Sequence, residues 1–403
     1  MIQRFGDKRD GFFENRFGMF IHWGLYSITA RDMWYYSHEK VSQAEYEKLA
    51  ERFDPVDYEP AAWAALAVEA GMRYSVITAK HHDGYCLYDS KLTEFKSTNS
   101  PCKRDLISDW VDAFRDAGLK VGFYYSLLDW HHPDYTLDDC HPQRDNEEVK
   151  AESRDLQKYV DYLHGQVREL LTGYGKMDLL WADFSWHDKG APEWQAEKLL
   201  KMVRKLQPDI IVNNRTGLLG DFTTPEQYVP AKTPEEKGKK LPWETCMTIG
   251  QSWGYYRQDP MNKTTEQLIR TLVDCVSKDG NFLLKVGPTP RGRIQDRFIA
   301  QLWEIGDWMR LNGDSIYGAG QSAYKADADC RYTQRGDKLY LHILNYTGRN
   351  IPLAGLYGKV AHATLLRDGT DLNLRTENKR LWVVPPQLPP DEIDTVVELQ
   401  LLQ

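Results

Sequence analysis

Short apolar runs alternate with amphipathic stretches over about the first 315 residues, and this alternation limits the fold more than any other feature. Each run suits a buried strand, and each stretch between has apolar residues at helical spacing. The predicted strands are 17–23, 74–79, 120–125, 177–183, 210–212, 244–251 and 281–287, and the predicted helices are 60–70, 105–118, 146–171, 194–206, 264–278 and 298–311. This order predicts a parallel sheet, and the length suits an α/β fold with a (β/α)8-like barrel of the TIM type. An open, doubly wound sheet competes, but no glycine-rich fingerprint follows the first run.

The pattern changes near residue 320. Runs at 338–344, 360–366 and 380–384 are short, alternating or apolar, and separated by turns such as Asp368-Gly369. No helical period is visible there, so an all-β domain is predicted. We therefore divide the chain into a barrel domain, residues 1–315, and a C-terminal all-β domain, residues 320–403. The charged tract at 235–240 is predicted to be a solvated, mobile loop.

Polar and aromatic side chains recur where the predicted strands end. The stretch 177–186 begins as an apolar run with one acid inside, Asp178, and the run stops at Asp183. A carboxylate at the end of a buried strand is costly to bury without a partner or a task. A lone aspartate in this position is more often a helix cap or a turn residue. Here the same pattern recurs at six strand ends, with His22, His81, Tyr124, Asp183, Arg215 and Trp253. The carboxyl ends of barrel strands meet on one face, so these side chains are predicted to build a site.

The chemistry of this set suits a glycosidic bond. Two carboxylates can cleave such a bond when one attacks the anomeric carbon and the other protonates the leaving oxygen. Asp183 is the predicted nucleophile, because it lies at a strand end. For the acid, Glu226 and Glu244 are both candidates, and the residue pattern does not separate them. Trp faces would cover the apolar side of a sugar ring, while imidazole, guanidinium and phenol groups bind its hydroxyls.

Metal chemistry is the rival hypothesis. Two histidine pairs, His81-His82 beside Asp83 and His131-His132 near Asp134, have ligand types suited to a metal. Neighbouring residues on an extended backbone point to opposite sides, so one pair rarely supplies two ligands to one ion. We therefore expect no metal and no cofactor.

Composition limits the partners. The net charge is −8, and no basic stripe or tail suggests nucleic acid. No run of 18 apolar residues suggests a membrane span, and the first residues have no apolar leader. The six cysteines are scattered without a CxxC pair, which favours free thiols. We expect a cytoplasmic protein, or a secreted or periplasmic one if a leader has been removed, and a homo-oligomer is compatible with the sequence.

Seven segments of the chain, in order, match a known family. They are FGMFIHWGLYS, AGMRYSVITAKHHDGYCLYDS, KVGFYYSLLDW, LLWADF, GDFTTPE, WETCMTIGQSWGY and DGNFLLKVGP. Together they resemble the α-L-fucosidases of glycoside hydrolase family 29, over residues 15 to 315. The resemblance implies a barrel followed by a β-sandwich, no metal, and a retaining exo-hydrolase that releases terminal α-L-fucosyl residues. Its partner would be a fucosylated oligosaccharide or glycoside.

The resemblance also implies roles for residues. Asp183 stands where the family has its nucleophile, and Glu226 matches the acid/base of one family branch, which favours it over Glu244. The positions that match the fucose pocket of relatives are His22, Trp34, His81, His82, Tyr124, Trp181, Arg215 and Trp253.

Two positions depart from the family pattern. Met33 precedes Trp34 where relatives usually have Glu, and a thioether accepts a sugar hydroxyl bond poorly. Asp32 is the neighbouring acid that could replace it. Because of this departure, the preferred substrate could instead carry a related L-sugar, such as L-galactose or L-glucose. The alternative from another functional class is a non-catalytic sugar-binding protein on the same scaffold. Lys285, where relatives often have Asn, is the second departure.

Overall fold

The computed structural model describes residues 5–185 and 188–402, so Trp186 at the end of the 177–186 stretch lies outside the described residues. One sheet of the first domain has seven strands in the order β5-β4-β3-β2-β1-β9-β8, and all its pairs are parallel. Its strands are β1 Phe17–Ile21, β2 Tyr74–Lys80, β3 Lys120–Ser126, β4 Leu179–Asp183, β5 Ile211–Val212, β8 Glu244–Thr248 and β9 Asn281–Val286.

An irregular segment, residues 222–226, closes this sheet into a barrel. Parallel bridges join Asn213 to Phe222 on one side, and Glu226 to Cys246 on the other. The backbone N–H of Asp221 donates to the carbonyl of Val212 at 2.7 Å, so the segment begins beside the end of β5. The segment takes the place of an eighth strand between β5 and β8. The predicted barrel is confirmed, and the open sheet is excluded.

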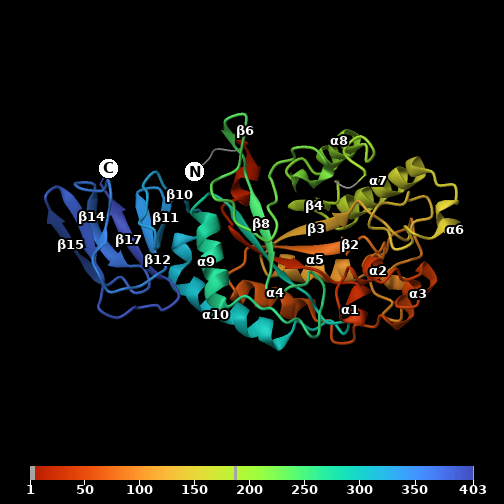
Figure 1. Cartoon of the computed structure of the whole chain (residues 1–403), viewed down its shortest axis with the longest axis horizontal. Coiled ribbons are helices and arrows are strands. Elements are labelled where there is room, and N and C mark those ends of the chain that lie inside the picture. The colour runs from red at the N-terminus through yellow and green to blue at the C-terminus, as the bar shows by residue number, and fades with distance from the viewer. Residues whose placement is uncertain (1–4, 186–187, 403) are drawn as a thin grey trace.

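The longer helices lie along the outside of the barrel (Figure 1). They are α4 Pro60–Glu69, α5 Leu106–Asp116, α7 Leu156–Gly173, α8 Ala196–Leu206, α9 Thr265–Val276 and α10 Asp296–Asn312. The short helices α1 Tyr26–Thr29, α2 Tyr35–His38, α3 Gln43–Glu47 and α6 Glu147–Lys150 lie beyond the carboxyl ends of the strands. Helix α9 begins with a capping box, in which the side chains of Thr264 and Gln267 each accept from the other's backbone N–H. The helix predicted over 146–171 is two helices, since Asp155 caps the start of α7.

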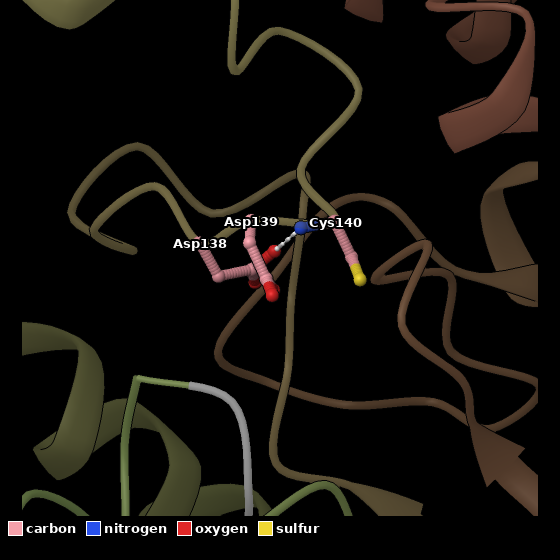
Figure 2. Close-up of side chains that lie close together, drawn as sticks. All are labelled: Asp138, Asp139 and Cys140. Atoms are coloured by element: carbon pink, nitrogen blue, oxygen red, sulfur yellow. Dashed lines mark hydrogen bonds between the residues drawn. The ribbon is translucent and has the colours of Figure 1, made fainter.

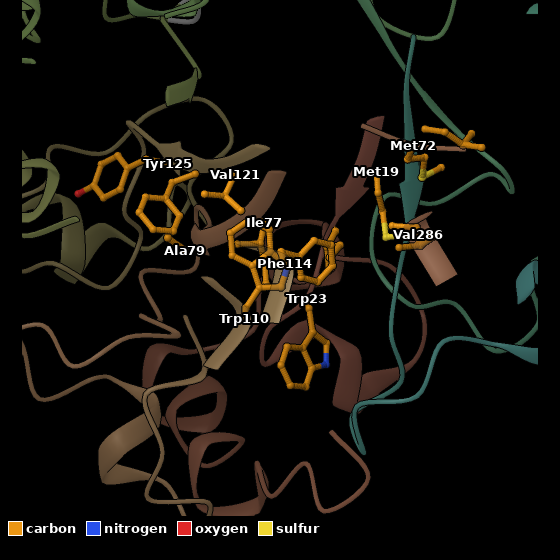
Figure 3. Packing of buried hydrophobic residues seen from close by; sticks show 14 of the residues in the cluster. Met19, Trp23, Met72, Ile77, Ala79, Trp110, Phe114, Val121, Tyr125 and Val286 are labelled. Atoms are coloured by element: carbon orange, nitrogen blue, oxygen red, sulfur yellow. The ribbon is translucent and has the colours of Figure 1, made fainter. Parts of the chain in front are cut away.

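Side chains alternate between two apolar cores along each strand. Phe20 and Trp181 belong to the cluster inside the barrel. Their neighbours Ile21 and Leu180 belong to the outer cluster under the helices. This alternation follows from the two-residue period of a strand. Figure 3 shows the outer cluster, including Met19, Ile77, Ala79, Trp110, Phe114, Val121, Tyr125 and Val286.

The amino end of the barrel is filled by aromatic rings. Phe12, in the 3₁₀ helix η1 (Lys8–Phe12), lies 4.9 Å from the ring of Tyr74. Phe13 lies 6.0 Å from Phe222 of the closing segment. Because both rings are buried, the barrel is plugged at this end, and a ligand has access only at the other.

The C-terminal domain is all-β, as predicted. Its eight-stranded antiparallel sheet has the order β10-β11-β12-β17-β14-β15-β16-β13. The strands are β10 Gly320–Gln321, β11 Cys330–Arg335, β12 Lys338–Ile343, β13 Ile351–Pro352, β14 Val360–Leu365, β15 Asp371–Glu377, β16 Arg380–Val384 and β17 Thr395–Leu401. Strands that are not neighbours share one core, since Leu341 of β12 and Val383 of β16 belong to the same cluster. The sheet therefore folds over itself as a β-sandwich.

The sandwich packs beside α9 and α10 (Figure 1). Trp308 of α10 donates its indole N–H to the carbonyl of Asp394 at 3.2 Å. Arg331 of β11 forms an ion pair with Asp274 of α9 at 2.8 Å. These bonds attach the sandwich to the outside of the barrel.

The charged tract at 235–240 differs from the prediction of a loop. It is an exposed hairpin of two short strands, β6 Glu235–Glu236 and β7 Lys239–Lys240. Opposite charges face each other across this pair, which favours the hairpin. Among the described residues, no helix is both long and apolar enough to span a membrane.

Candidate active site

A cavity of about 200 Å³ lies at the carboxyl ends of the barrel strands. Nine of the ten predicted site residues line it, and His82 does not. The lining residues are Phe20, His22, Met33, Trp34, His81, Tyr124, Trp181, Asp183, Phe184, Arg215, Glu226, Cys246 and Trp253. The walls are thus mostly aromatic, and the few charged groups gather on one side. Such a site suits a small ligand with one apolar face and several polar groups.

Asp183 is the last residue of β4 and is held by three donors. Its Oδ1 accepts from Arg215 Nη1 at 2.8 Å and from the N–H of Phe184 at 3.1 Å. Its Oδ2 accepts from the hydroxyl of Tyr124 at 2.8 Å. Burial raises the pKa of Asp183, Arg215 opposes this shift, and the charge of Glu226 adds to it. The three donors orient the carboxylate toward the cavity and stabilise its charge.

Arg215 joins the two candidate catalytic carboxylates. It lies in η4 (Asn214–Thr216), directly after β5, and its Nη2 donates to Glu226 Oε2 at 2.7 Å. Its guanidinium also lies over the ring of Trp181, 4.5 Å from the centroid. Burial opposes its charge, but Asp183 and Glu226 keep the pKa of Arg215 above its usual value. One cation therefore holds both acids at the same side of the pocket.

Glu226 and Glu244 have opposite surroundings. Glu226 ends the closing segment, and 37% of its side chain is exposed, so the carboxyl group is open to a substrate. Glu244 is the first residue of β8, is fully buried and does not line the cavity. It accepts from Tyr74 and from the indole of Trp181, and burial raises its pKa to about 7. Only Glu226 has the access that a general acid needs.

Two histidines form a neutral wall of the pocket. The ring of His81 stacks on Tyr124 at 4.8 Å, and His22 lies 5.7 Å from His81. Burial lowers the pKa of both imidazoles well below its usual value. Nδ1 of His81 accepts from the N–H of His82 at 2.8 Å, so the proton of the neutral ring lies on Nε2. This ring can therefore donate a hydrogen bond to a ligand hydroxyl.

His82 is not among the residues that line the cavity, but its buried ring lies beside three that are, Trp34, His81 and Phe184. Its ring stacks on Trp130 at 4.0 Å and lies 4.8 Å from Trp34. The rings of His81 and His82 lie 4.2 Å apart in an edge-to-face contact, where the chain turns after β2. His82 therefore packs against Trp34, which lines the cavity.

The structure adds residues that sequence reasoning did not select. Phe20 precedes His22 by two positions in the chain, so strand alternation could have identified it. Cys246 gave no such signal. Phe184 has φ 71°, which is unusual for an aromatic residue, and it turns the chain directly after Asp183. Met33 lines the cavity, whereas Asp32 does not line it and instead accepts from the Ser252 hydroxyl at 3.0 Å.

One group of metal-type ligands occurs in the described part of the chain, and it lies outside the pocket. Asp138, Asp139 and Cys140 come together in the loop after β3 (Figure 2). Asp138 already accepts from Tyr135, from Trp130 and from the N–H of Cys140. This carboxylate is therefore occupied by structural bonds. Of the two histidine pairs, only His81 lines the cavity.

At the carboxyl end of this barrel, two carboxylates bind one arginine in a small aromatic pocket. This arrangement is typical of a sugar-processing hydrolase. The chain belongs to the α-L-fucosidase family, because the family model described as Alpha-L-fucosidase matches residues 7–314. The predicted family is thus confirmed, and the protein is an enzyme of the glycoside hydrolase class.

Individual relatives agree with this assignment. The structure superposes on α-L-fucosidase isoenzyme 1 from Paenibacillus thiaminolyticus with a TM-score of 0.96 and 49% identity, over 98% of this chain and 99% of that one. A Bacteroides thetaiotaomicron family 29 enzyme, trapped as a covalent intermediate with 2-fluoro-fucosyl fluoride, has a TM-score of 0.89 and 29% identity, over 98% and 97%. Tissue α-L-fucosidase of Bos taurus is 30% identical over 95% of this chain and 86% of its own length.

Proposed function

We propose that this enzyme removes a terminal α-L-fucosyl residue from a glycoside or oligosaccharide by double displacement, with Asp183 as nucleophile and Glu226 as acid/base. The observation that carries the proposal is the single guanidinium of Arg215, which bonds to Asp183 at 2.8 Å and to Glu226 at 2.7 Å. Two carboxyl groups on one side of a small pocket suit the short separation that retention requires, about 5 to 5.5 Å.

In the first step, an oxygen of Asp183 attacks the anomeric carbon, and the bond from that carbon to the leaving oxygen breaks. Glu226 gives its proton to the leaving oxygen, so the aglycone departs as an alcohol. Tyr124, Arg215 and the N–H of Phe184 hold the attacking carboxylate in one orientation. This orientation lowers the barrier because the nucleophile is placed before the substrate arrives.

In the second step, Glu226 takes a proton from water, and the water oxygen attacks the same carbon. The bond to Asp183 breaks, and the sugar leaves with its original anomeric configuration. The exposure of Glu226 supports this role, since both the aglycone and the water must reach its carboxyl group.

The pocket favours a single terminal sugar. Its volume is small, and Phe20 and Trp181 close it from inside the barrel. Trp34 and Trp253 offer flat apolar faces, while His22 and His81 offer neutral imidazoles to hydroxyl groups. A sugar with a methyl group on one edge fits this division between apolar and polar walls.

The test combines a substrate panel with trapping. We expect 4-nitrophenyl α-L-fucoside to be hydrolysed faster than the matching L-galactoside and L-glucoside, with retained configuration in an NMR time course. A 2-fluoro-fucosyl fluoride should label one peptide, the one that contains Asp183. Inverted product, label on another carboxylate, or no turnover of any α-L-glycoside would refute the proposal.

A further inference from the structure

A buried lysine lies behind the pocket wall, and the proposed catalytic steps do not use it. Lys285, near the end of β9, is 2% exposed. Its Nζ donates to the carbonyl of Ser252 at 2.8 Å and to the carbonyl of Gly254 at 3.1 Å. These two residues flank Trp253, which lines the cavity. The ammonium group therefore attaches the loop that carries Trp253 to the barrel.

A second bond links this loop to the neighbouring loop that carries Asp32. The hydroxyl of Ser252 donates to Asp32 Oδ1 at 3.0 Å. The N–H of Trp34 donates to the same oxygen at 3.4 Å. Asp32 thus connects the Trp253 loop to the loop that places Met33 and Trp34 in the pocket.

The two loops are also closely packed. A β-carbon on Gly254 would lie 2.9 Å from the ring of Tyr26 and 3.4 Å from Cβ of Met33. Glycine therefore permits the close approach, and a shift of one loop would move the other.

We propose that Lys285 is a positioning residue for the sugar pocket. It holds Trp253 against the barrel, and through Ser252 and Asp32 it also fixes the loop of Met33 and Trp34. The inference rests on the proposed function, because it assumes that these side chains form the walls around the fucosyl ring.

The surroundings of Lys285 make this constraint dependent on pH. Burial lowers the pKa of Lys285 to about 7, and the groups that act on it are two acids and two bases. They are Asp259, Asp32, Arg297 and Lys263. His22, on the side of the pocket, is neutral because burial lowers its pKa. Below pH 7 the ammonium makes charge-assisted bonds to both carbonyls, and above pH 7 a neutral amine makes weaker ones. Ligand affinity should therefore fall as pH rises through 7.

The test measures the Kd of L-fucose by calorimetry at pH 6 and pH 8, together with thermal unfolding. Lys285→Met has nearly the same length without donors, and Ser252→Ala breaks only the link to Asp32. Lys201→Met, at an exposed position on α8, is the matched control. We expect Lys285→Met to weaken binding about tenfold at pH 6 and less at pH 8, and Ser252→Ala about threefold. The double variant should be no weaker than Lys285→Met, because both changes act through one chain of bonds.

The outcomes separate the two proposals. If the wild type binds L-fucose and the variants bind it equally tightly, the inference about Lys285 is overturned and the proposed function is not. Equal losses at both pH values, with additive effects in the double variant, also overturn it, because a purely structural lysine would behave so. If Lys285→Met does not fold, Ser252→Ala decides by the same measurement. A wild type that does not bind L-fucose at either pH overturns the proposed function and the inference together.

Discussion

The two ends of the barrel treat a buried carboxylate in opposite ways. At the carboxyl end, Asp183 faces a cavity and pairs with Arg215. At the amino end, Glu244 starts its strand, is fully enclosed and accepts from two neutral donors, Tyr74 and Trp181. Both residues come from the same parallel sheet. Their surroundings differ because strand direction decides which end carries the long loops.

This difference separates catalysis from support. The carboxyl end has a cation, a cavity and solvent access, so a charge there can react. The amino end is plugged by Phe12 and Phe13, and an acid there serves to hold Trp181, the floor of the pocket. Barrel enzymes in general place chemistry at the first end and stability at the second. Four experiments can break or sharpen this comparison.

The largest effect is expected at Asp183. Asp183→Ala should lower kcat by at least about a thousandfold, because the covalent step loses its nucleophile. Thermal unfolding should show an intact fold, since the buried Arg215 keeps its second ion pair, with Glu226. Glu244→Gln is the matched control at the other end of the barrel, and it should retain activity. A comparable loss of kcat in Glu244→Gln would show that the amino end of the barrel also takes part in catalysis.

Glu226 should give a loss that depends on the leaving group. Glu226→Ala should slow glycosides with poor leaving groups by about 10²- to 10⁴-fold, because only these need protonation. Activated aryl fucosides should be much less affected in their first step, and azide should partly restore turnover by replacing water. Steady-state rates across a leaving-group series check this. If Glu244→Gln shows this dependence on the leaving group and Glu226→Ala does not, the acid/base is Glu244 and the assignment to Glu226 is wrong.

Glu244 should influence stability in a pH-dependent way. Its pKa is raised to about 7 in the fold, above the unfolded value, so folding binds a proton between about pH 4.5 and 7. The wild type therefore loses stability as pH rises through this range, and Glu244→Gln does not. We expect the variant to be more stable by roughly 1 to 3 kcal/mol at pH 8 and equal at pH 4.5.

Denaturant unfolding at the two pH values measures this difference. Glu197→Gln, at an exposed position on α8, makes the same chemical change without burial. If the wild type and Glu244→Gln have the same free energy of unfolding at both pH values, burial of the Glu244 carboxyl group does not destabilise the fold.

The smallest effect is expected at Met33, where the pocket lining has a thioether. Met33→Glu would add a hydroxyl acceptor to the wall and should raise kcat/KM on an α-L-fucoside by about tenfold. Met261→Glu makes the same change on an exposed loop and should have no effect. No gain in Met33→Glu, together with efficient hydrolysis by the wild type, would show that this wall needs only an apolar side chain.

Sequence patterns predicted most of the strands because burial on both faces leaves apolar runs in the chain. The strand at 380–384 matches β16, and the predicted runs at 17–23 and 281–287 contain β1 and β9. The closing segment, 222–226, lies between the predicted strands 210–212 and 244–251, where the sequence predicts no strand. It contains a proline and threonines, and its place in the barrel depends on bonds to β5 and β8 that no local pattern encodes.

The sequence by itself determined the barrel, the all-β domain and the strand ends that carry Asp183, Arg215 and Tyr124. These follow from the period of apolar residues and from the polarity of each strand end, which are local properties. The residue pattern left Glu226 and Glu244 open, and only the family resemblance favoured Glu226. The tertiary structure showed that Glu226 lines the cavity and Glu244 does not, and that His81 lines it and His82 does not. The physical reason is that these choices depend on which side of the closed sheet a side chain faces and on what lies across from it. Such contacts join residues far apart in the chain.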